Sequence, residues 1–220
     1  MAAQPGAPFS INDIVPIANH LTEAGVVAVK ADSPYKTIEE LVAAAKEKGN
    51  LKASTNGNKA SNHTAAQLLA KSAGFKYKAI PYGGTADQLL ALRQGEVDFT
   101  CAKVADVAKL VKGDKPELRV LAVFNTKRDP ELPNVPTLGE KGLYPEWYGS
   151  ARALVAPKGT KPEVIQYYVE AFKKTMQDPA VIEAHKKAGM ALDFKDNKEL
   201  GDLIKAQDKF ARDVVNDLYK

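Results

Sequence analysis

The stretch STNGNKASNHTAAQLL, residues 54–69, joins a run of small polar residues to a segment rich in alanine and leucine. The residues before the loop predict a strand at 51–55, and those after it predict a helix from about Asn62 to Ala73. The first N–H groups of a helix lack partners within the helix and carry a partial positive charge, so anions bind there readily. We therefore interpret this loop as a candidate ligand site, whose residues are Ser54, Thr55, Asn56, Gly57, Asn58, Ser61 and His63.

A second loop, PYGGTAD at residues 81–87, repeats this arrangement between a predicted strand at 76–82 and a leucine-rich helix. A third predicted strand, at 97–100, ends at Thr100. Ligands of open parallel sheets bind at the carboxyl ends of strands, beside the starts of helices. Two such loops side by side would hold one carboxylate from two directions. The candidate residues added here are Tyr82, Gly83, Gly84, Thr85 and Thr100.

Other interpretations of the same residues stay open. Ser, Asn and Gly before a helix are also ordinary capping residues. Ser61, His63 and Asp98 could be imagined as a hydrolytic triad, but the G-x-S-x-G pattern of a nucleophile elbow is absent. The spacing of a phosphate-binding P-loop is also absent, and no spacing of His, Asp and Glu suggests a metal site. We predict no catalytic residue, metal or cofactor.

Outward from these loops, strands and helices alternate between residues 24 and 124, which predicts an α/β lobe with a largely parallel sheet. The expected strands are at 24–29, 51–55, 76–82, 97–100 and 118–124. Thr37 and Glu40 have the spacing of a capping box and predict a helix that ends at Gly49. A further helix is expected at 102–112.

The two ends of the chain offer a strand at 151–156 and several helices, two of which begin at the spacing of a capping box. These are Thr160 with Glu163, and Asp196 with Glu199. Apolar stripes of this size need a sheet to cover, so we expect the two ends to form a separate, incomplete lobe, with an N-terminal part missing or another chain completing it. The expected division is 1–31 and 150–220 for this incomplete lobe (lobe 1), 32–124 for the ligand-binding lobe (lobe 2), and 125–149 for a connecting region.

The composition excludes several classes of protein. The chain has 45% hydrophobic and 26% charged residues with a net charge of +4, which is ordinary for a globular protein. No cluster of Lys and Arg is interleaved with aromatic residues, so nucleic-acid binding gains little support. A single cysteine, Cys101, permits no internal disulfide and no cysteine zinc cluster. No apolar run approaches the roughly 18 residues of a membrane helix, so we expect no direct membrane insertion.

From Phe9 to Tyr219 the sequence resembles the solute-binding proteins of tripartite tricarboxylate transporters, the TctC or Bug family. The resemblance is carried by an ordered set of segments. These are NDIVPIA at 12–18, the loop at 54–63, IPYGG at 80–84, GEVD at 95–98, and LPNVPTLGEKG at 132–142.

The resemblance implies a two-lobed, type II periplasmic-binding-protein-like fold that captures a small organic carboxylate without catalysis. It implies a periplasmic location and delivery of the ligand to the membrane permease subunits of a transporter. In the family, the other lobe supplies a glycine-rich loop after its first strand, which has no counterpart here, nor is an export signal present in this chain. We therefore expect an N-terminally truncated member. The alternative is the ligand-sensing effector domain of a transcription regulator with the same fold.

Overall fold

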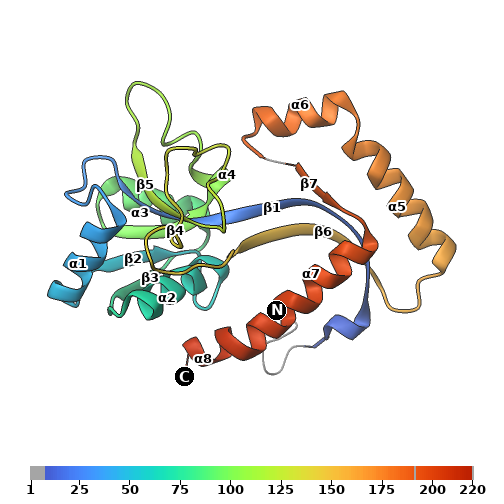
Figure 1. Cartoon of the computed structure of the whole chain (residues 1–220), viewed down its shortest axis with the longest axis horizontal. Coiled ribbons are helices and arrows are strands. Elements are labelled where there is room, and N and C mark those ends of the chain that lie inside the picture. Colours follow the sequence, from blue (N-terminus) through green and yellow to red (C-terminus); the bar gives the residue numbers. More distant parts are fainter. Residues whose placement is uncertain (1–7, 191, 220) are drawn as a thin grey trace. The chain divides into compact units, whose positions relative to one another are not determined.

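The computed structural model describes residues 8–190 and 192–219 (Figure 1). Its contacts divide the chain into two compact units. The central unit is Glu23–Ser150, and the terminal unit combines Met1–Thr22 with Ala151–Lys220. Residues 125–149 group with the central unit in this division, whereas the sequence suggested a separate connecting region. The lobe boundaries expected from the sequence stay a prediction.

The central unit is built on a sheet with the strand order β3-β2-β4-β1-β5. Its strands are β1 (Ile14–Lys30), β2 (Lys52–Thr55), β3 (Lys78–Pro81), β4 (Phe99–Lys103) and β5 (Leu118–Phe124). β2 runs parallel to β3 and β4, but β1 lies between β4 and β5 and runs antiparallel to both. The sheet is therefore mixed, which corrects the largely parallel sheet expected from the sequence. Strands β2 to β5 alternate with helices along the chain and run parallel to one another, as that alternation predicts. The apolar sequence of β1 does not indicate in which direction this strand runs relative to them.

Four helices connect these strands: α1 (Ile38–Lys48), α2 (Ser61–Ala73), α3 (Thr85–Gln94) and α4 (Val104–Val107). The predicted capping box of α1 is present, with the side chains of Thr37 and Glu40 each accepting the other's backbone N–H. The helix expected at 102–112 is wrong in length, because 102 and 103 belong to β4 and only one turn of α-helix follows. Apolar residues such as Val107 and Val111 still pack on the core, so their spacing looked helical.

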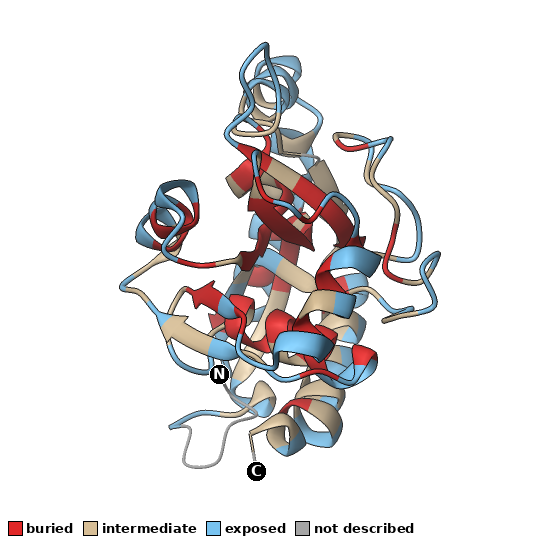
Figure 2. Ribbon diagram, turned by 90° about the vertical axis from the view of Figure 1, so that its left-hand side faces the viewer, coloured by how far each residue is buried: buried red, intermediate tan, exposed pale blue. Residues whose placement is uncertain are grey.

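The core of the central unit lies between the sheet and the helices that pack on it (Figure 2). It contains Val26 and Ala28 of β1, Val123 of β5 and Leu92 of α3, all buried. Trp147, the only tryptophan, packs against this cluster and is partly buried. Burial of this apolar surface is the main favourable term that holds the strands and the two candidate loops in place.

The terminal unit contains the first half of β1, two more strands and most of the C-terminal helices (Figure 1). Its elements are η1 (Ile11–Asp13), β6 (Gly149–Pro157), α5 (Pro162–Met176), α6 (Pro179–Lys187), β7 (Leu192–Lys195), α7 (Asn197–Phe210), a π-helical turn (Ala211–Val215) and α8 (Asn216–Leu218). β6 and β7 both pair with β1, and β7 does so antiparallel. The sequence missed β7 and the first half of β1, so this unit has more sheet than expected.

The two predicted capping boxes of the terminal unit differ in outcome. Asp196 and Glu199 form theirs at the start of α7. The box at Thr160 and Glu163 is wrong, because α5 has Lys161 as its N-cap and Pro162 as its first residue. Proline fits the first helical position, where its missing N–H is not needed. Glu163 is then the second helical residue and not the third. Among the described residues, no helix is both long and apolar enough to cross a membrane.

Candidate functional site

The two loops singled out in the sequence begin side by side at the carboxyl ends of β2 and β3, and we call this end of the strands the edge of the central sheet. Thr55 is the register partner of Pro81 in the parallel ladder of β2 and β3. The backbone N–H of Tyr82 donates to the carbonyl of Thr55 at 2.9 Å. Gly57 follows β2 and is partly exposed, and Gly83 follows β3 and is exposed. The starts of α2 and α3 are therefore presented at the same edge.

The loop between β2 and α2 is shaped by its backbone and by two side chains. Gly57 has φ +116°, a conformation that residues with a Cβ rarely adopt. The side-chain carbonyl of Asn56 accepts the N–H of Asn62 at 3.2 Å, and Lys59 donates its N–H to Nδ1 of His63 at 3.0 Å. The N-cap residue of α2, Ala60, provides no side-chain hydrogen bond. Asn56 therefore serves as a remote cap and leaves the rest of this helix start for other acceptors.

His63 is buried in the first turn of α2 and supports the loop rather than chemistry. Burial lowers its pKa below the usual value, because the charged imidazolium is poorly solvated there. Its Nδ1 accepts a hydrogen bond, so the neutral ring carries its proton on Nε2. The hydrolytic alternative fails on geometry. Asp98 accepts the N–H of Lys52 at the opposite end of β2 from Ser61 and His63.

Three predicted site residues are fully buried and hydrogen-bonded inside the protein: Ser54, Thr55 and Thr100. The Ser54 hydroxyl lies 3.0 Å from both the Gln88 carbonyl and Oγ1 of Thr100. Thr100 donates its own hydroxyl to the Ser54 carbonyl at 2.9 Å, and Thr55 donates to the Gly57 carbonyl at 3.3 Å. These hydroxyls fix the strand ends beneath the loops. The sequence placed them at the correct edge but could not show that their hydrogen bonds are satisfied internally.

The second loop begins α3 without a side-chain cap. Gly84 is the N-cap residue, in extended conformation, and Thr85 is the first helical residue. Tyr82 donates its hydroxyl to Glu96 at 3.0 Å, and its pKa is raised by partial burial and by this carboxylate. Asp87 lies in the first turn of α3, where a Cβ on Gly83 would stand 3.4 Å from its carboxylate. The start of α3 therefore already has a negative charge nearby, whereas the first turn of α2 has no acidic residue.

The sequence interpretation missed two buried residues at this edge, Gln88 and Lys103. Nε2 of Gln88 donates to Thr100 at 2.5 Å and to the Cys101 carbonyl at 2.6 Å, and its Oε1 accepts from Asn62 at 3.0 Å. The ammonium of Lys103 lies 2.6 Å from Oδ1 of Asn62 and 3.4 Å from Oγ of Ser61. Lys103 ends β4, and its place at a strand end is the same signal that predicted Thr100 as a site residue. The sequence analysis missed Lys103 because it assigned residues 102–112 to a helix.

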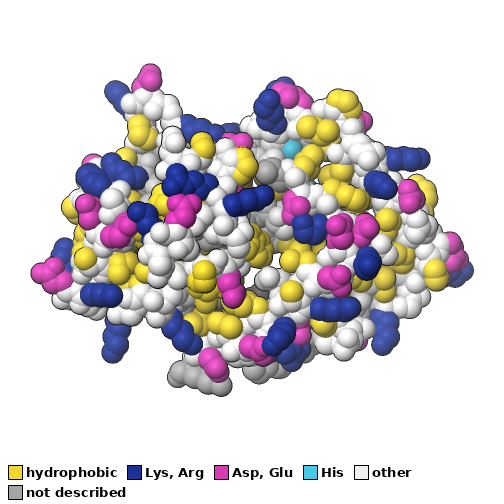
Figure 3. Space-filling model, in the orientation of Figure 1, with side chains coloured by type: hydrophobic (Ala, Val, Ile, Leu, Met, Phe, Trp, Pro, Cys, Tyr) yellow, Lys and Arg dark blue, Asp and Glu magenta, His cyan; other side chains and the backbone are white. Residues whose placement is uncertain are grey.

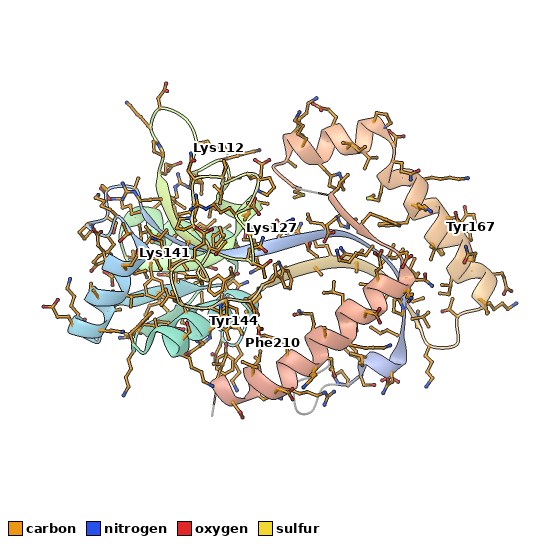
Figure 4. The ribbon with its side chains drawn as sticks, viewed as in Figure 1. Lys112, Lys127, Lys141, Tyr144, Tyr167 and Phe210 are labelled. Carbon is orange, nitrogen blue, oxygen red and sulfur yellow. The ribbon has the colours of Figure 1, made fainter. Side chains whose placement is uncertain are left out.

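Aromatic residues after β5 complete this edge of the central unit. Tyr148 donates its hydroxyl to the Ser61 carbonyl at 3.2 Å, and its ring packs on Phe124 with centroids 6.2 Å apart. Tyr144, labelled in Figure 4, packs on the same phenylalanine at 5.8 Å. The Tyr144 hydroxyl is buried without a hydrogen-bond partner among the described residues, and burial raises its pKa to about 12. A phenol that stays protonated can only serve a ligand as a neutral hydrogen-bonding group.

Other surface features do not compete with this edge. On the face shown in Figure 3, Lys and Arg side chains are interspersed with Asp and Glu. A groove of about 400 Å³ lies along β5 and the segment near Leu132, and none of the predicted site residues lines it. Within the described residues, no group of three or more His, Cys, Asp and Glu side chains is placed to hold a metal ion.

Comparison with protein families gives one match, to the tripartite tricarboxylate transporter family receptor, over residues 4–218. The UPF0065 protein in the gbd 5'region of Cupriavidus necator is 37% identical over 170 residues, which are 77% of this chain and 50% of that protein. The UPF0065 protein in the tcbD-tcbE intergenic region of Pseudomonas sp. strain P51 is 31% identical over 210 residues, covering 92% of this chain and 61% of that protein. The chain thus spans only half to three fifths of the length of these relatives.

Solved structures match the fold over nearly the whole chain. A TctC solute-binding protein from Polaromonas, without ligand, has a TM-score of 0.81 at 27% identity, covering 96% of this chain and 72% of that one. An R. palustris protein solved with adipate has a TM-score of 0.83 at 21% identity, covering 94% and 69%. MatC from Rhodopseudomonas palustris, with bound malate, has a TM-score of 0.81 at 22% identity, covering 97% and 74%. These matches confirm the predicted periplasmic-binding-protein-like α/β fold.

Proposed function

Because the chain belongs to the tripartite tricarboxylate transporter receptor family, a family of solute-binding proteins and not of enzymes, we propose that it captures a small organic carboxylate for a transporter of this type. The ligand would then pass to the permease subunits in the membrane. The proposed location is the periplasm, where such receptors meet their ligands. The relatives are longer than this chain, so the ligand and partners of the whole protein are part of the proposal.

The observation that carries the proposal is the shared edge of the two loops, fixed by the Thr55–Pro81 register. The starts of α2 and α3 lie there together, and neither N-cap residue makes a side-chain hydrogen bond. Backbone N–H groups at helix starts are suited to carboxylate oxygens by charge and by hydrogen-bonding capacity. In this proposal the ligand contacts come from Asn56, Gly57, Asn58, Ser61, Gly83, Gly84 and Thr85, while the buried residues hold them in place.

The ligands bound in solved proteins of similar fold only suggest which compounds to test. The proteins solved with adipate and malate are 21% and 22% identical to this chain, so the likeness concerns their fold alone. A shared fold does not determine a ligand, because ligands are chosen by the residues of the site. The carboxylate class is therefore argued from the helix starts of this chain. No observation favours the alternative of a regulator's effector domain.

The proposal is tested by calorimetric titration and thermal unfolding of the chain with malate, adipate, succinate, citrate and benzoate. Binding to the folded state stabilises a protein by about 2.7 kcal/mol when the ligand is present at 100 times its Kd. We expect at least one acid to bind saturably and to raise the Tm. The matching uncharged amides and a sugar serve as controls. Absence of binding by every acid, or equal binding of acids and amides, contradicts the proposal.

A further inference from the structure

Lys103 is the one lysine among the described residues that is classed as buried, with 5% of its surface exposed. It ends β4 at the edge where the ligand loops begin. Burying an ammonium group is costly unless other groups solvate it. Its position is therefore a specific feature of this sequence and needs a physical reason.

The surroundings of Lys103 hold its ammonium at the first turn of α2. Oδ1 of Asn62 accepts from the ammonium at 2.6 Å, and Asn62 is itself buried, with 1% exposed. The amide group of Asn62 donates to Gln88 at 3.0 Å, and its backbone N–H donates to Asn56 at 3.2 Å. Gln88 is fixed in turn by Thr100. This chain of buried amides orients the positive charge.

The contact with Ser61 determines what that residue offers a ligand. Oγ of Ser61 lies 3.4 Å from the ammonium, which has only protons to give, so the serine oxygen is the acceptor. The hydroxyl proton of Ser61 then remains to be donated elsewhere. Tyr148 already occupies the Ser61 carbonyl at 3.2 Å. Ser61, the first residue of α2, is thus a hydrogen-bond donor, and it interacts most favourably with a ligand atom that accepts a hydrogen bond.

The charges differ at the two helix starts. The first turn of α3 contains Asp87, whereas the first turn of α2 has no acidic residue and lies against Lys103. A fixed cation in a site of low dielectric favours an anionic group over a neutral one of the same shape. Of the two helix starts, that of α2 is therefore the more favourable for an anion.

We propose that Lys103 determines specificity in the ligand site, so that the α2 start accepts an ionised carboxylate and rejects its neutral amide. This inference rests on the proposed function and adds the residue that sets the required charge. In the competing, structural explanation the charge of Lys103 serves only the buried carboxylate of Glu23. Glu23 lies two residues along β1 from Gly25, the partner of Lys103 in the β1–β4 ladder.

The test compares adipate with adipamide, and succinate with succinamide, because neither diamide has a carboxylate that can occupy the α2 start. Lys103→Met removes the charge, Lys103→Gln keeps a side chain able to hydrogen-bond, and Lys112→Met removes an exposed lysine as a control. Affinities are measured by calorimetry, and folding is checked by circular dichroism. We expect the unsubstituted chain to prefer the diacids about tenfold or more, as for a charge-assisted hydrogen bond. Lys103→Met should reduce this preference to about threefold or less, and Lys112→Met should keep it.

Each outcome decides between the explanations. If Lys103→Met folds and keeps the full preference for diacids, Lys103 serves only the structure and the inference is overturned. If that variant does not fold, Lys103→Gln decides by the same ratio. Binding of adipate and adipamide by the unsubstituted chain with equal affinity also overturns the inference. If the unsubstituted chain binds neither acid nor amide, the proposed function fails, and the inference with it. If the chain binds carboxylates but the variants keep the ratio of acid to amide affinity, only the role of Lys103 is refuted and the proposed function stands.

Discussion

At the scale of single residues, the candidate ligand loop between β2 and α2 depends on a few positions whose chemistry is not interchangeable. Gly57 provides a backbone conformation, Asn56 caps α2 from a distance, and His63 supports the loop from beneath. The sequence predicted all three as site residues. It could not assign their separate tasks, because hydrogen-bond partners and burial depend on the packed structure. For the same reason it treated the internally bonded hydroxyls of Ser54 and Thr100 as ligand contacts.

Replacement of Gly57 by alanine should destabilise the protein and weaken ligand binding. Its φ of +116° strains any residue with a Cβ, although only the Cβ of Ala60, at 3.8 Å, lies near the new methyl group. We expect a loss of about 1–3 kcal/mol, measured by urea unfolding. Gly84→Ala is the matched control, because Gly84 has an extended backbone and no atom within 4 Å of an added Cβ. Equal stability of the two variants would contradict this account of the loop.

The pH dependence of stability should show the contribution of two histidines, the buried His63 and the partly buried His20. Burial lowers the pKa of His63 and of His20, and the charges of His185 and Arg152 lower that of His20 further. As pH falls through about 6.5, the unfolded chain takes up these protons before the folded chain does. The stabilisation contributed by the neutral rings is therefore fully present above about pH 7 and decreases as the pH falls to about 5.5. In urea unfolding at these two pH values, His63→Gln should lose less stability than the unsubstituted chain. An identical loss in both proteins contradicts this contribution.

At the scale of elements, the sequence predicted those helix and strand boundaries that local signals mark, and missed the extent of elements without such signals. The capping box at Thr37 and the glycine that ends α1, Gly49, were readable, because each satisfies groups within a few residues. β5 (Leu118–Phe124) was predicted with its observed bounds. β1 was predicted only in part, because its first half alternates irregularly and contains Pro16. The box at Thr160 failed because Pro162 shifts the start of α5 by one residue.

These two capping sequences give a matched comparison. Thr37→Ala removes a side chain that accepts the N–H of Glu40 at 3.2 Å, so it should cost about 1 kcal/mol in urea unfolding. Glu163→Ala removes the residue that occupies the position of Glu40 in the sequence pattern but makes no capping contact, so it should cost less than about 0.5 kcal/mol. A loss at Glu163 as large as that at Thr37 would mean that the box at α5 forms in solution.

At the scale of the whole molecule, the α/β class and the family relationship were predictable from the sequence. The mixed sheet was not, because strand direction depends on how β1 enters between β4 and β5. The terminal unit remains the less buried of the two. Tyr167 of α5, labelled in Figure 4, has 69% of its surface exposed, and α6 contains no buried residue. This chain covers 72% of the solved Polaromonas relative, so that protein has further residues without a match in this chain.

Amide NMR during titration with adipate and malate shows directly whether the starts of α2 and α3 together bind a carboxylate. We expect saturable shifts concentrated at the N–H groups of Gly57, Ser61, Gly83, Gly84 and Thr85. We expect much smaller shifts at the groove along β5, near Leu132 and Val135. Saturable shifts confined to that groove, with the two loops unchanged, would contradict the account.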